Sequence, residues 1–263
     1  MLTAEDVSDV PADFVADPFM LKEEGTWYMF FEVFNSRSQH GDIGLAVSKD
    51  GYNWAYRRIV LDMPFHLSYP FVFKWEDDYY LIPESYEADS VQLYKAEDFP
   101  ARWILIGRLL EGNFVDSTIL FHDQTFWLFA ETNPKGNDRL SLFSSPLVTG
   151  PWEAHPQNPI IGKDANIARP AGRIVESSGR LLRFAQDDTP TYGNRIRAFE
   201  IRELTQNAYQ EIEVDMSPIL AGSGNGWNAD GMHHIDCHRL EDGSWIACVD
   251  GYRFDHSNSV NRK

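Results

Sequence analysis

The sequence predicts an all-β fold, a single five-bladed β-propeller in which four-stranded antiparallel blades surround a central channel. Three observations support this fold class: a hairpin motif that recurs along the chain, a high content of aromatic and β-branched residues, and turn residues at regular intervals. The chain has 263 residues, 43% hydrophobic and 14% aromatic, which is enough apolar surface for one sizeable core.

The recurring motif is clearest in three segments of equal length that align without gaps and end in glutamate. They cover residues 17–32, 69–84 and 116–131. A fourth copy, 169–186, is two residues longer in its turn, and a fifth runs from 235 to 250. Each copy consists of a strand-like segment, a tight polar turn and a second strand-like segment, so each predicts a β-hairpin.

Further strand-like segments follow each hairpin, which gives four strands per blade. The predicted blades of this single domain cover roughly residues 15–62, 63–112, 113–162, 163–220 and 221–263. Because a blade can bury its faces only against its neighbours, the repeat implies a closed ring. The stretch after Asp250 is too short for the outer half of the last blade, so we expect residues 3–14 to supply a strand that closes the ring.

The charge of the chain excludes several classes of partner. It has 40 acidic and 23 basic residues, a formal net charge of -17. Nucleic-acid binding depends on Lys and Arg that neutralise phosphates, so neither nucleic acid nor an anionic membrane surface is an expected partner. No apolar run is long enough to cross a bilayer, so no membrane insertion is expected.

Two cysteines, Cys237 and Cys248, flank a turn-like segment at 241–244. If the flanking segments pair as a hairpin, the two thiols would face each other, and a disulfide would be geometrically conceivable. The first residues, however, lack the charged and apolar regions of a secretion signal, which favours a cytoplasmic protein with free thiols.

Equivalent positions of the five hairpins should meet in one ring, because the first strand of each blade lines the channel. The predicted strand starts carry Asp17, Tyr69, Asp116, Arg169 and the pair His233 and His234, and the second strands end in Glu32, Glu84, Glu131, Gln186 and Asp250. Carboxylates forced together acquire different pKa values, which lets one site hold both an acid and a base. Alternatively, each glutamate caps a strand, bonds to loop amides or pairs with an arginine.

Other polar residues are candidates for contact with a ligand. His40, His66 and either His233 or His234 could contact sugar hydroxyls. Trp227, in a glycine-rich loop, is the best candidate for a sugar-stacking platform, whereas the other tryptophans fall within or beside strands. Four residues near the fourth hairpin are expected at the rim of the pocket: Asp187, Asp188, Tyr192 and Arg195. No His, Cys and Asp cluster has metal-ligand spacing along the chain, so no cofactor is expected and a central Ca²⁺ has no support.

The sequence resembles the arabinanase, levansucrase and invertase group of five-bladed propellers, especially glycoside hydrolase family 43. The matching segments include 16–18, 43–54, 115–116 and 145–152. The resemblance implies inverting hydrolysis with Asp17 as the base and Asp116 as the residue that tunes the acid, and inversion requires two carboxyls with room for a water.

The chain departs from this family pattern at the residue that would act as the catalytic acid. The family's glutamate opens the channel strand of the fourth blade, where this chain has Arg169. Glu84 and Glu131 are the replacement candidates, and we choose Glu84 because Pro83 stiffens the strand end. Arg169 either binds an acidic or phosphorylated sugar through its guanidinium fork or forms a structural salt bridge to Asp17 or Asp116.

A second resemblance spans residues 17 to 250. The segments 39–44, 65–71, 83–85 and 191–193 are similar to the propeller that precedes the transferase domain in glucosamine inositolphosphorylceramide transferases. The leading hypothesis is therefore a glycan-active hydrolase or transferase. Its rival is a non-catalytic carbohydrate-binding propeller that accompanies a transferase domain, covalently or not. A protein-interaction propeller is a third alternative.

Overall fold

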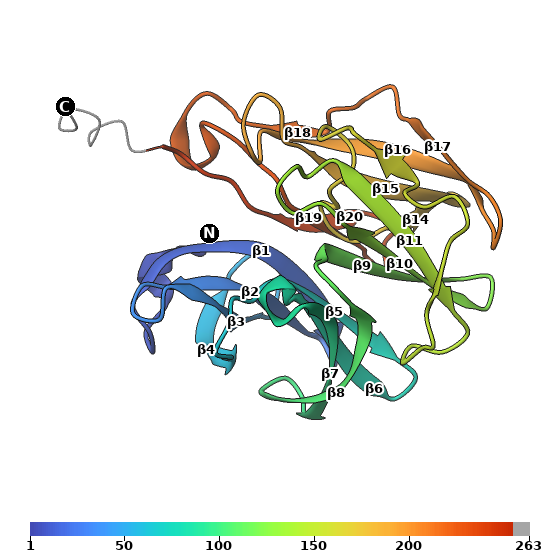
Figure 1. Cartoon of the computed structure of the whole chain (residues 1–263). Coiled ribbons are helices and arrows are strands. Elements are labelled where there is room, and N and C mark those ends of the chain that lie inside the picture. Colours follow the sequence, from blue (N-terminus) through green and yellow to red (C-terminus); the bar gives the residue numbers. More distant parts are fainter. Residues whose placement is uncertain (255–263) are drawn as a thin grey trace.

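The computed structural model describes residues 1–254 and shows an all-β propeller whose sheets follow one another around a centre (Figure 1). Residues 255–263, which the sequence assigns to the fifth blade, lie outside the described part of the chain. The first blade contains β1 (Ala12–Glu23), β2 (Thr26–Asn35), β3 (His40–Ser48) and β4 (Ala55–Leu61). The second contains β5 (Ser68–Trp75), β6 (Asp78–Glu84), β7 (Ser90–Asp98) and β8 (Arg102–Glu111).

The remaining sheets are antiparallel as well. The third blade contains β9 (Val115–His122), β10 (Thr125–Glu131) and β11 (Arg139–Ser145), with the short β12 (Glu153–Ala154) and β13 (Ile161–Gly162) both paired to β11. The fourth contains β14 (Val175–Ser177), β15 (Arg180–Asp187) and β16 (Arg195–Leu204), with β17 (Tyr209–Glu213) and β18 (Leu220–Ala221) both paired to β16. The fifth contributes β19 (Ile235–Arg239) and β20 (Trp245–Val249).

Three single turns of 3₁₀ helix complete the described elements: η1 (Ala4–Asp6), η2 (Tyr86–Ala88) and η3 (Gly226–Asn228). In the part of the chain that the structure describes, no helix has the length and apolar character to traverse a membrane.

The hydrophobic core lies between the blades. In β2, Phe30 packs toward the second blade, whereas Met29 and Phe31 pack toward the fifth. In β10, Leu128 likewise faces the second blade, and Trp127 faces the fourth. Successive residues of a strand point to opposite faces, so a strand with a neighbour on each side is apolar at nearly every position. This packing explains why the repeated hairpins are so uniformly hydrophobic.

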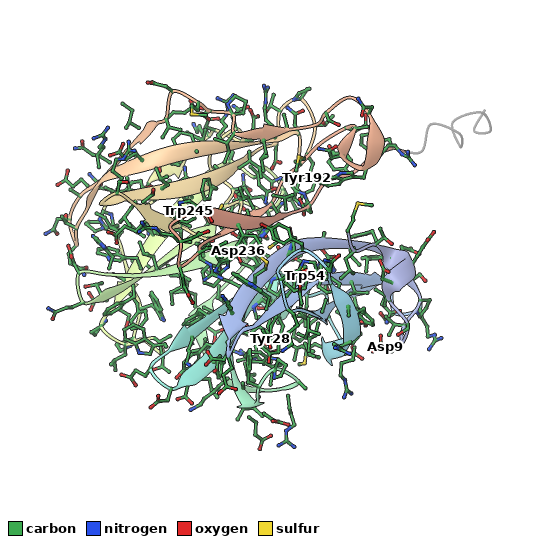
Figure 2. The ribbon with its side chains drawn as sticks, turned by 180° about the vertical axis from the view of Figure 1, so that it is seen from behind. Asp9, Tyr28, Trp54, Tyr192, Asp236 and Trp245 are labelled. Carbon is green, nitrogen blue, oxygen red and sulfur yellow. The ribbon has the colours of Figure 1, made fainter. Side chains whose placement is uncertain are left out.

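The first and last blades close the ring through side chains and the central strands. Ile246 and Cys248 of β20 belong to the same core cluster as Met20 of β1. The Cys248 thiol lies 2.8 Å from the Pro18 carbonyl oxygen, and the backbone N–H of Met20 donates to Oδ2 of Asp236 at 2.6 Å. Figure 2 labels Asp236 between the first blade and the sheets of the last two.

The N-terminal segment does not pair with the fifth sheet as we expected. Among residues 1–254, β20 pairs only with β19. Residues Ala12 and Phe14 instead extend β1 and pair with Asn35 and Phe34 of β2. The segment therefore belongs to the first blade, where its apolar side chains join the same interface.

The prediction that the two thiols face each other is wrong. Asp236 pairs with Cys248 and Cys237 pairs with Ala247, so the two sulfur atoms point to opposite faces of the hairpin. Both cysteines are free.

Candidate functional site

A backbone bulge recurs at the start of the channel strand in the first three blades. Asp17, Tyr69 and Asp116 occupy equivalent positions and adopt φ angles of 51°, 42° and 50°. In each case two residues of the channel strand oppose a single residue of the second strand. A left-handed conformation is unfavourable for a tyrosine and occurs more readily for aspartate. Such strain is found mainly at functional sites, where the surrounding structure maintains it.

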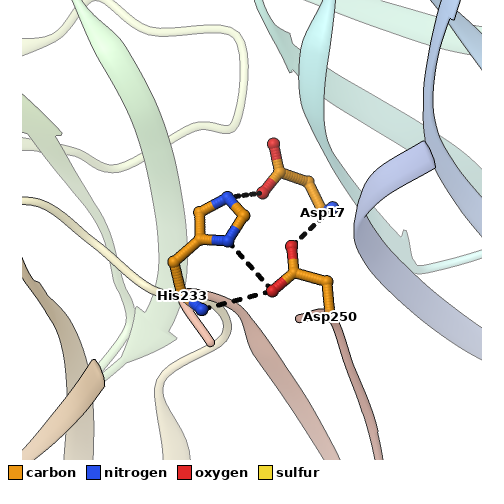
Figure 3. Close-up of side chains that lie close together, drawn as sticks. All are labelled: Asp17, His233 and Asp250. Carbon is orange, nitrogen blue, oxygen red and sulfur yellow. Dashed lines mark hydrogen bonds and ion pairs between the residues drawn. The ribbon is translucent and has the colours of Figure 1, made fainter. Parts of the chain in front are cut away.

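Three side chains from the first and fifth blades meet at one point of the ring (Figure 3). The ring of His233 lies between two carboxylates: Nε2 is 3.4 Å from Oδ1 of Asp17, and Nδ1 is 3.0 Å from Oδ1 of Asp250. Asp250 also accepts the backbone N–H of Asp17 at 3.1 Å. The N–H of Tyr69 donates to the other oxygen of Asp17 at 3.2 Å. We name Asp17, His233 and Asp250 the acid–histidine cluster.

The charges of this cluster compensate one another. Burial lowers the pKa of His233, but the carboxylate of Asp250 and other negative groups outweigh burial and raise that pKa well above its ordinary value. Burial raises the pKa of Asp17, yet its hydrogen bond to His233 and the positive charge there bring that pKa below its ordinary value. Asp250 behaves in the same way, with a pKa lowered mainly by His233. An imidazolium thus separates two carboxylates.

The ligand atoms of the acid–histidine cluster all lie within 4.8 Å of one another, a spacing that could accommodate a cation. A metal-binding histidine has to be unprotonated. The raised pKa of His233 therefore opposes metal binding at this cluster, because a cation would have to displace the proton of the imidazole.

A second ionic group connects the second, third and fourth blades. Nε of Arg169 donates to Oδ2 of Asp116 at 2.5 Å, and Gln186 donates to the same oxygen at 2.8 Å. Nη2 of Arg169 lies 3.8 Å from the Glu84 carboxylate. The guanidinium also lies 5.0 Å from the ring centre of Tyr192. Of the two salt bridges that we considered for Arg169, the structure contains the one to Asp116.

Two buried glutamates favour their protonated forms. Burial raises the pKa of Glu84 well above its ordinary value, the charge of Asp116 adds to the shift, and Arg169 opposes it. Burial also raises the pKa of Glu32 well above its ordinary value, with further contributions from Asp17 and Glu84. Nε2 of His66 lies 3.6 Å from Oε1 of Glu32. Carboxyl groups with raised pKa values therefore lie near Asp17, whose pKa is lowered, a separation of pKa values that acid–base chemistry uses.

Glu131 ends β10 and connects to the loop that follows. Its Oε1 accepts the backbone N–H groups of Asn133 at 2.7 Å and Arg139 at 3.3 Å. Burial raises the pKa of Glu131 to about 7, although these hydrogen bonds oppose the shift. This arrangement agrees with the loop-capping alternative. Tyr69 is fully buried, and its hydroxyl lies 2.7 Å from Oγ1 of Thr118, so it forms part of the packed interior beneath the carboxylates.

The predicted rim residues differ in their surroundings. Asp187 is fully buried and forms ion pairs with Arg195 at 2.9 Å and Arg197 at 2.8 Å. Tyr192 is 49% exposed, and its ring centre lies 5.4 Å from that of His233, which places it over both ionic groups. Asp188 accepts the Gly193 N–H at 2.8 Å.

Trp227 lies in a groove between the first and fifth blades. The groove has a volume of about 960 Å³, and its lining includes Phe14, Tyr52, Trp227 and, at the acid–histidine cluster, Asp250. His40, by contrast, lies at the start of β3, where its nearest acidic neighbour is Asp42 at 3.4 Å. The structure therefore gives His40 different polar neighbours from those of the other predicted site residues.

Arg173 and Asp236 join four blades and were not among the predicted site residues. Arg173 donates to the Val72 carbonyl at 2.8 Å and to Asp236 at 2.8 Å. A signal was present, because the fourth hairpin has arginine at the position where the first three have apolar residues: Leu21, Phe73 and Leu120.

Comparisons with solved structures define the class to which this fold belongs. The catalytic domain of the GH62 α-L-arabinofuranosidase of Coprinopsis cinerea superposes with a TM-score of 0.70 at 14% identity, over 94% of this chain and 86% of that chain. A thermostable family-43 glycoside hydrolase superposes with a TM-score of 0.64 at 14% identity, over 94% and 87%. The chain thus has the propeller fold of these glycoside hydrolases.

The sequence comparisons identify the family. The model of the family described as "Glucosamine inositolphosphorylceramide transferase 1, N-terminal" matches residues 1–252, and the chain belongs to this family. Glucosamine inositolphosphorylceramide transferase 1 of Oryza sativa subsp. japonica is 38% identical over 259 residues, which are 96% of this chain and 35% of the relative. The chain therefore spans about a third of that protein's length, and the predicted resemblance is confirmed.

Proposed function

We propose that the site binds a glycan and that the propeller presents this glycan to a transferase domain. The observation that carries the proposal is a set of buried acceptor atoms around Arg169 that have no hydrogen-bond partner among residues 1–254. They are Oδ1 of Asp116, Oε2 of Glu131, Oε1 of Gln186 and Oδ2 of Asp188. Buried polar atoms without partners are unfavourable, and hydrogen-bond donors from ordered water or from the hydroxyl groups of a sugar would satisfy them.

The neighbouring groove supports a carbohydrate ligand. Trp227 is 44% exposed and Phe14 is 45% exposed, and both line the groove that reaches Asp250. Exposed aromatic rings beside convergent polar groups are a common composition of small-molecule sites. Sugar rings that stack on these faces would lead to the acid–histidine cluster.

The ion pairs favour binding over hydrolysis. Asp17, the base implied by the family-43 resemblance, is held by a protonated His233, and its lowered pKa makes it a weak base. Asp116 is neutralised by Arg169. Both aspartates are therefore better suited to accept hydrogen bonds from hydroxyl groups than to move protons.

A catalytic function is the second candidate, and one observation favours it. Glu84 has a strongly raised pKa and lies near Asp116 and Arg169, which is the environment of a general acid. In this alternative, Glu84 protonates the leaving oxygen of a glycosidic bond, and Asp17 accepts a proton from the attacking hydroxyl or water.

Three finer predictions remain proposals. The suggestion that the sugar is acidic or phosphorylated depends on Arg169, whose Nε and Nη1 already bond to Asp116 and Asn137. An anion would have to compete with Asp116. The association with a transferase domain follows from the name of the relatives, and the cytoplasmic location stays a prediction from the sequence.

Titration calorimetry and turnover assays on the same protein distinguish the two candidates. We expect neutral oligosaccharides from a glycan array to bind the wild type, and Asp116→Asn, which weakens the Arg169 contact, to reduce their affinity at least tenfold. No glycoside should be hydrolysed or transferred. Turnover that Glu84→Gln abolishes without loss of binding would support the catalytic candidate, and the absence of any glycan ligand would contradict both. Uronic acids and phosphorylated sugars in the same array test the finer prediction.

A further inference from the structure

A second group of metal-ligating side chains lies on the first blade. It comprises His40 and Asp42 of β3 and Asp62, which directly follows β4, and one ligand atom from each lies within 4.8 Å of the others. We name these residues the blade-one cluster. These residues are separate from the acid–histidine cluster.

The register of the sheet brings the two aspartates together. Ile43 pairs with Leu61, so the preceding and following residues, Asp42 and Asp62, adjoin across the two strands. Like charges directly opposite each other destabilise a sheet. Among the described residues, no Lys or Arg forms an ion pair with either aspartate, and the only ion pair of Asp42 is with His40. The cluster therefore lacks a permanent positive charge.

Asp42 supplies an independent indication of a ligand. Its side chain is fully buried, with 0% exposure. Oδ2 accepts a hydrogen bond from Asn35 at 2.9 Å, but Oδ1, the oxygen that points toward His40, has no hydrogen-bond partner within residues 1–254. A buried carboxylate oxygen without a donor is expensive unless a cation or water occupies the adjoining space.

We propose that the blade-one cluster binds one divalent transition-metal cation, of the class of Mn²⁺ or Zn²⁺, through His40, Asp42 and Asp62. Imidazole nitrogen together with carboxylate oxygen suits these ions. Ca²⁺ takes six to eight oxygen ligands and is disfavoured by a site that offers one nitrogen and two carboxylates. The bound cation neutralises the two aspartates and fastens the end of the outer strand β4 to β3.

Electron paramagnetic resonance with Mn²⁺ tests the proposal directly, because protein-bound Mn²⁺ loses the sharp signal of the free ion. We expect the chelator-treated full chain to bind one equivalent of Mn²⁺ and Zn²⁺ to displace it. At a hundredfold excess over Kd, the metal should raise Tm by about 5 °C. Asp42→Asn and His40→Gln should each weaken binding at least tenfold, and Ca²⁺ should bind more weakly than Mn²⁺.

The matched control is Asp123→Asn. Asp123 lies 3.5 Å from His122 and forms a His–Asp pair on the surface, outside the blade-one cluster. This variant should bind Mn²⁺ like the wild type. The proposal is overturned if the wild type leaves the free Mn²⁺ signal unchanged, or if both Asp42→Asn and His40→Gln bind Mn²⁺ with wild-type affinity. Because His40 is only partly buried, its variant preserves the test if Asp42→Asn fails to fold.

Discussion

The guanidinium of Arg173 and the carboxylate of Asp236 join the fourth blade to the fifth across the centre of the ring, with Nε donating to Oδ1 at 2.8 Å. The same guanidinium donates to the Val72 carbonyl in the second blade and lies 4.6 Å from the ring centre of Phe71. Asp236 also accepts the N–H of Met20 in the first blade. One ion pair thus connects four blades.

Removing this arginine should destabilise the ring severely. In Arg173→Met, Asp236 loses the guanidinium on Oδ1 and keeps only the His238 imidazole, 2.8 Å from Oδ2. Removing one partner of a buried ion pair costs about 3–5 kcal/mol of unfolding free energy. Urea denaturation measures the change. The double variant Arg173→Met with Asp236→Asn should lose less, since no charge is left unpaired. Arg102→Met, on the surface, should change stability by less than about 1 kcal/mol. Equal effects of Arg173→Met and Arg102→Met on the unfolding free energy would refute the proposed role of the Arg173–Asp236 ion pair.

Gly172 lies at a close approach between the backbones of the fourth and fifth blades. Its φ is 137°, and an added Cβ would lie 1.8 Å from the carbonyl oxygen of Ile235. Gly172→Ala should therefore reduce the unfolding free energy by about 3 kcal/mol or more and lower the soluble yield. Gly107→Ala is the control, because its Cβ would meet no atom within 4 Å. Similar melting temperatures for Gly172→Ala and Gly107→Ala would show that the backbones at Gly172 and Ile235 can move apart at little cost.

Glu131 should make stability depend on pH. Its pKa is raised from 4.5 to about 7 in the folded chain, so the folded state retains a proton that the unfolded state releases at lower pH. The resulting stabilisation is complete below pH 4.5 and is lost as the pH rises through about 7.

The comparison with Glu131→Gln isolates this contribution. Glutamine retains an acceptor oxygen for the loop amides but cannot ionise. Between pH 5 and pH 8 the wild type should lose up to about 3 kcal/mol of unfolding free energy relative to this variant. Glu111→Gln, whose side chain is 70% exposed, controls for the removal of one carboxylate. Parallel pH profiles of wild type and Glu131→Gln would contradict the expectation.

Trp227 should contribute to glycan affinity without contributing to stability. Trp227→Ala removes an exposed ring from the groove and should weaken glycan binding about tenfold in titration calorimetry, with Tm unchanged. Trp245 is exposed to a similar extent, 41% against 44%, but does not line the groove, so Trp245→Ala should bind normally. Equal losses in both variants would argue against the groove as the binding surface.

Neither thiol should form an internal disulfide. Cys237 and Cys248 point to opposite faces of one hairpin, and burial raises the pKa of Cys237 to about 12. Only the thiolate reacts readily, so a thiol reagent should modify the cysteines of the native protein slowly. In urea, the same reagent should modify both cysteines rapidly. An internal disulfide detected by mass spectrometry after mild oxidation would disprove the observed register.

The sequence predicted the hairpins well because their apolar strands and similar lengths arise from packing that every blade shares. It could not predict the register of the last hairpin, where a shift of one residue moves Cys237 to the other face. The left-handed conformation of Tyr69 has no local signal, since tyrosine disfavours it. Most of the polar residues expected at the strand starts and strand ends lie together around the centre of the ring. Which carboxylate pairs with which cation depends on distances between blades, and the repeat along the sequence does not specify these distances.

Below the carboxylates the centre of the ring is filled by side chains, since the buried rings of Phe19, Tyr69 and His234 pack against one another and the Tyr69 hydroxyl reaches Thr118. Arg173 contacts the carbonyl of Met20, three residues along β1 from Asp17, and it lines a separate cavity of about 410 Å³ on the far side. A sugar chain that entered the acid–histidine cluster would meet a floor and could not thread through the molecule. If the proposed glycan binding holds, such a pocket would select the end of a sugar chain over its interior, and the rest of the chain would leave through the same mouth, on the side where a further domain would have to reach it.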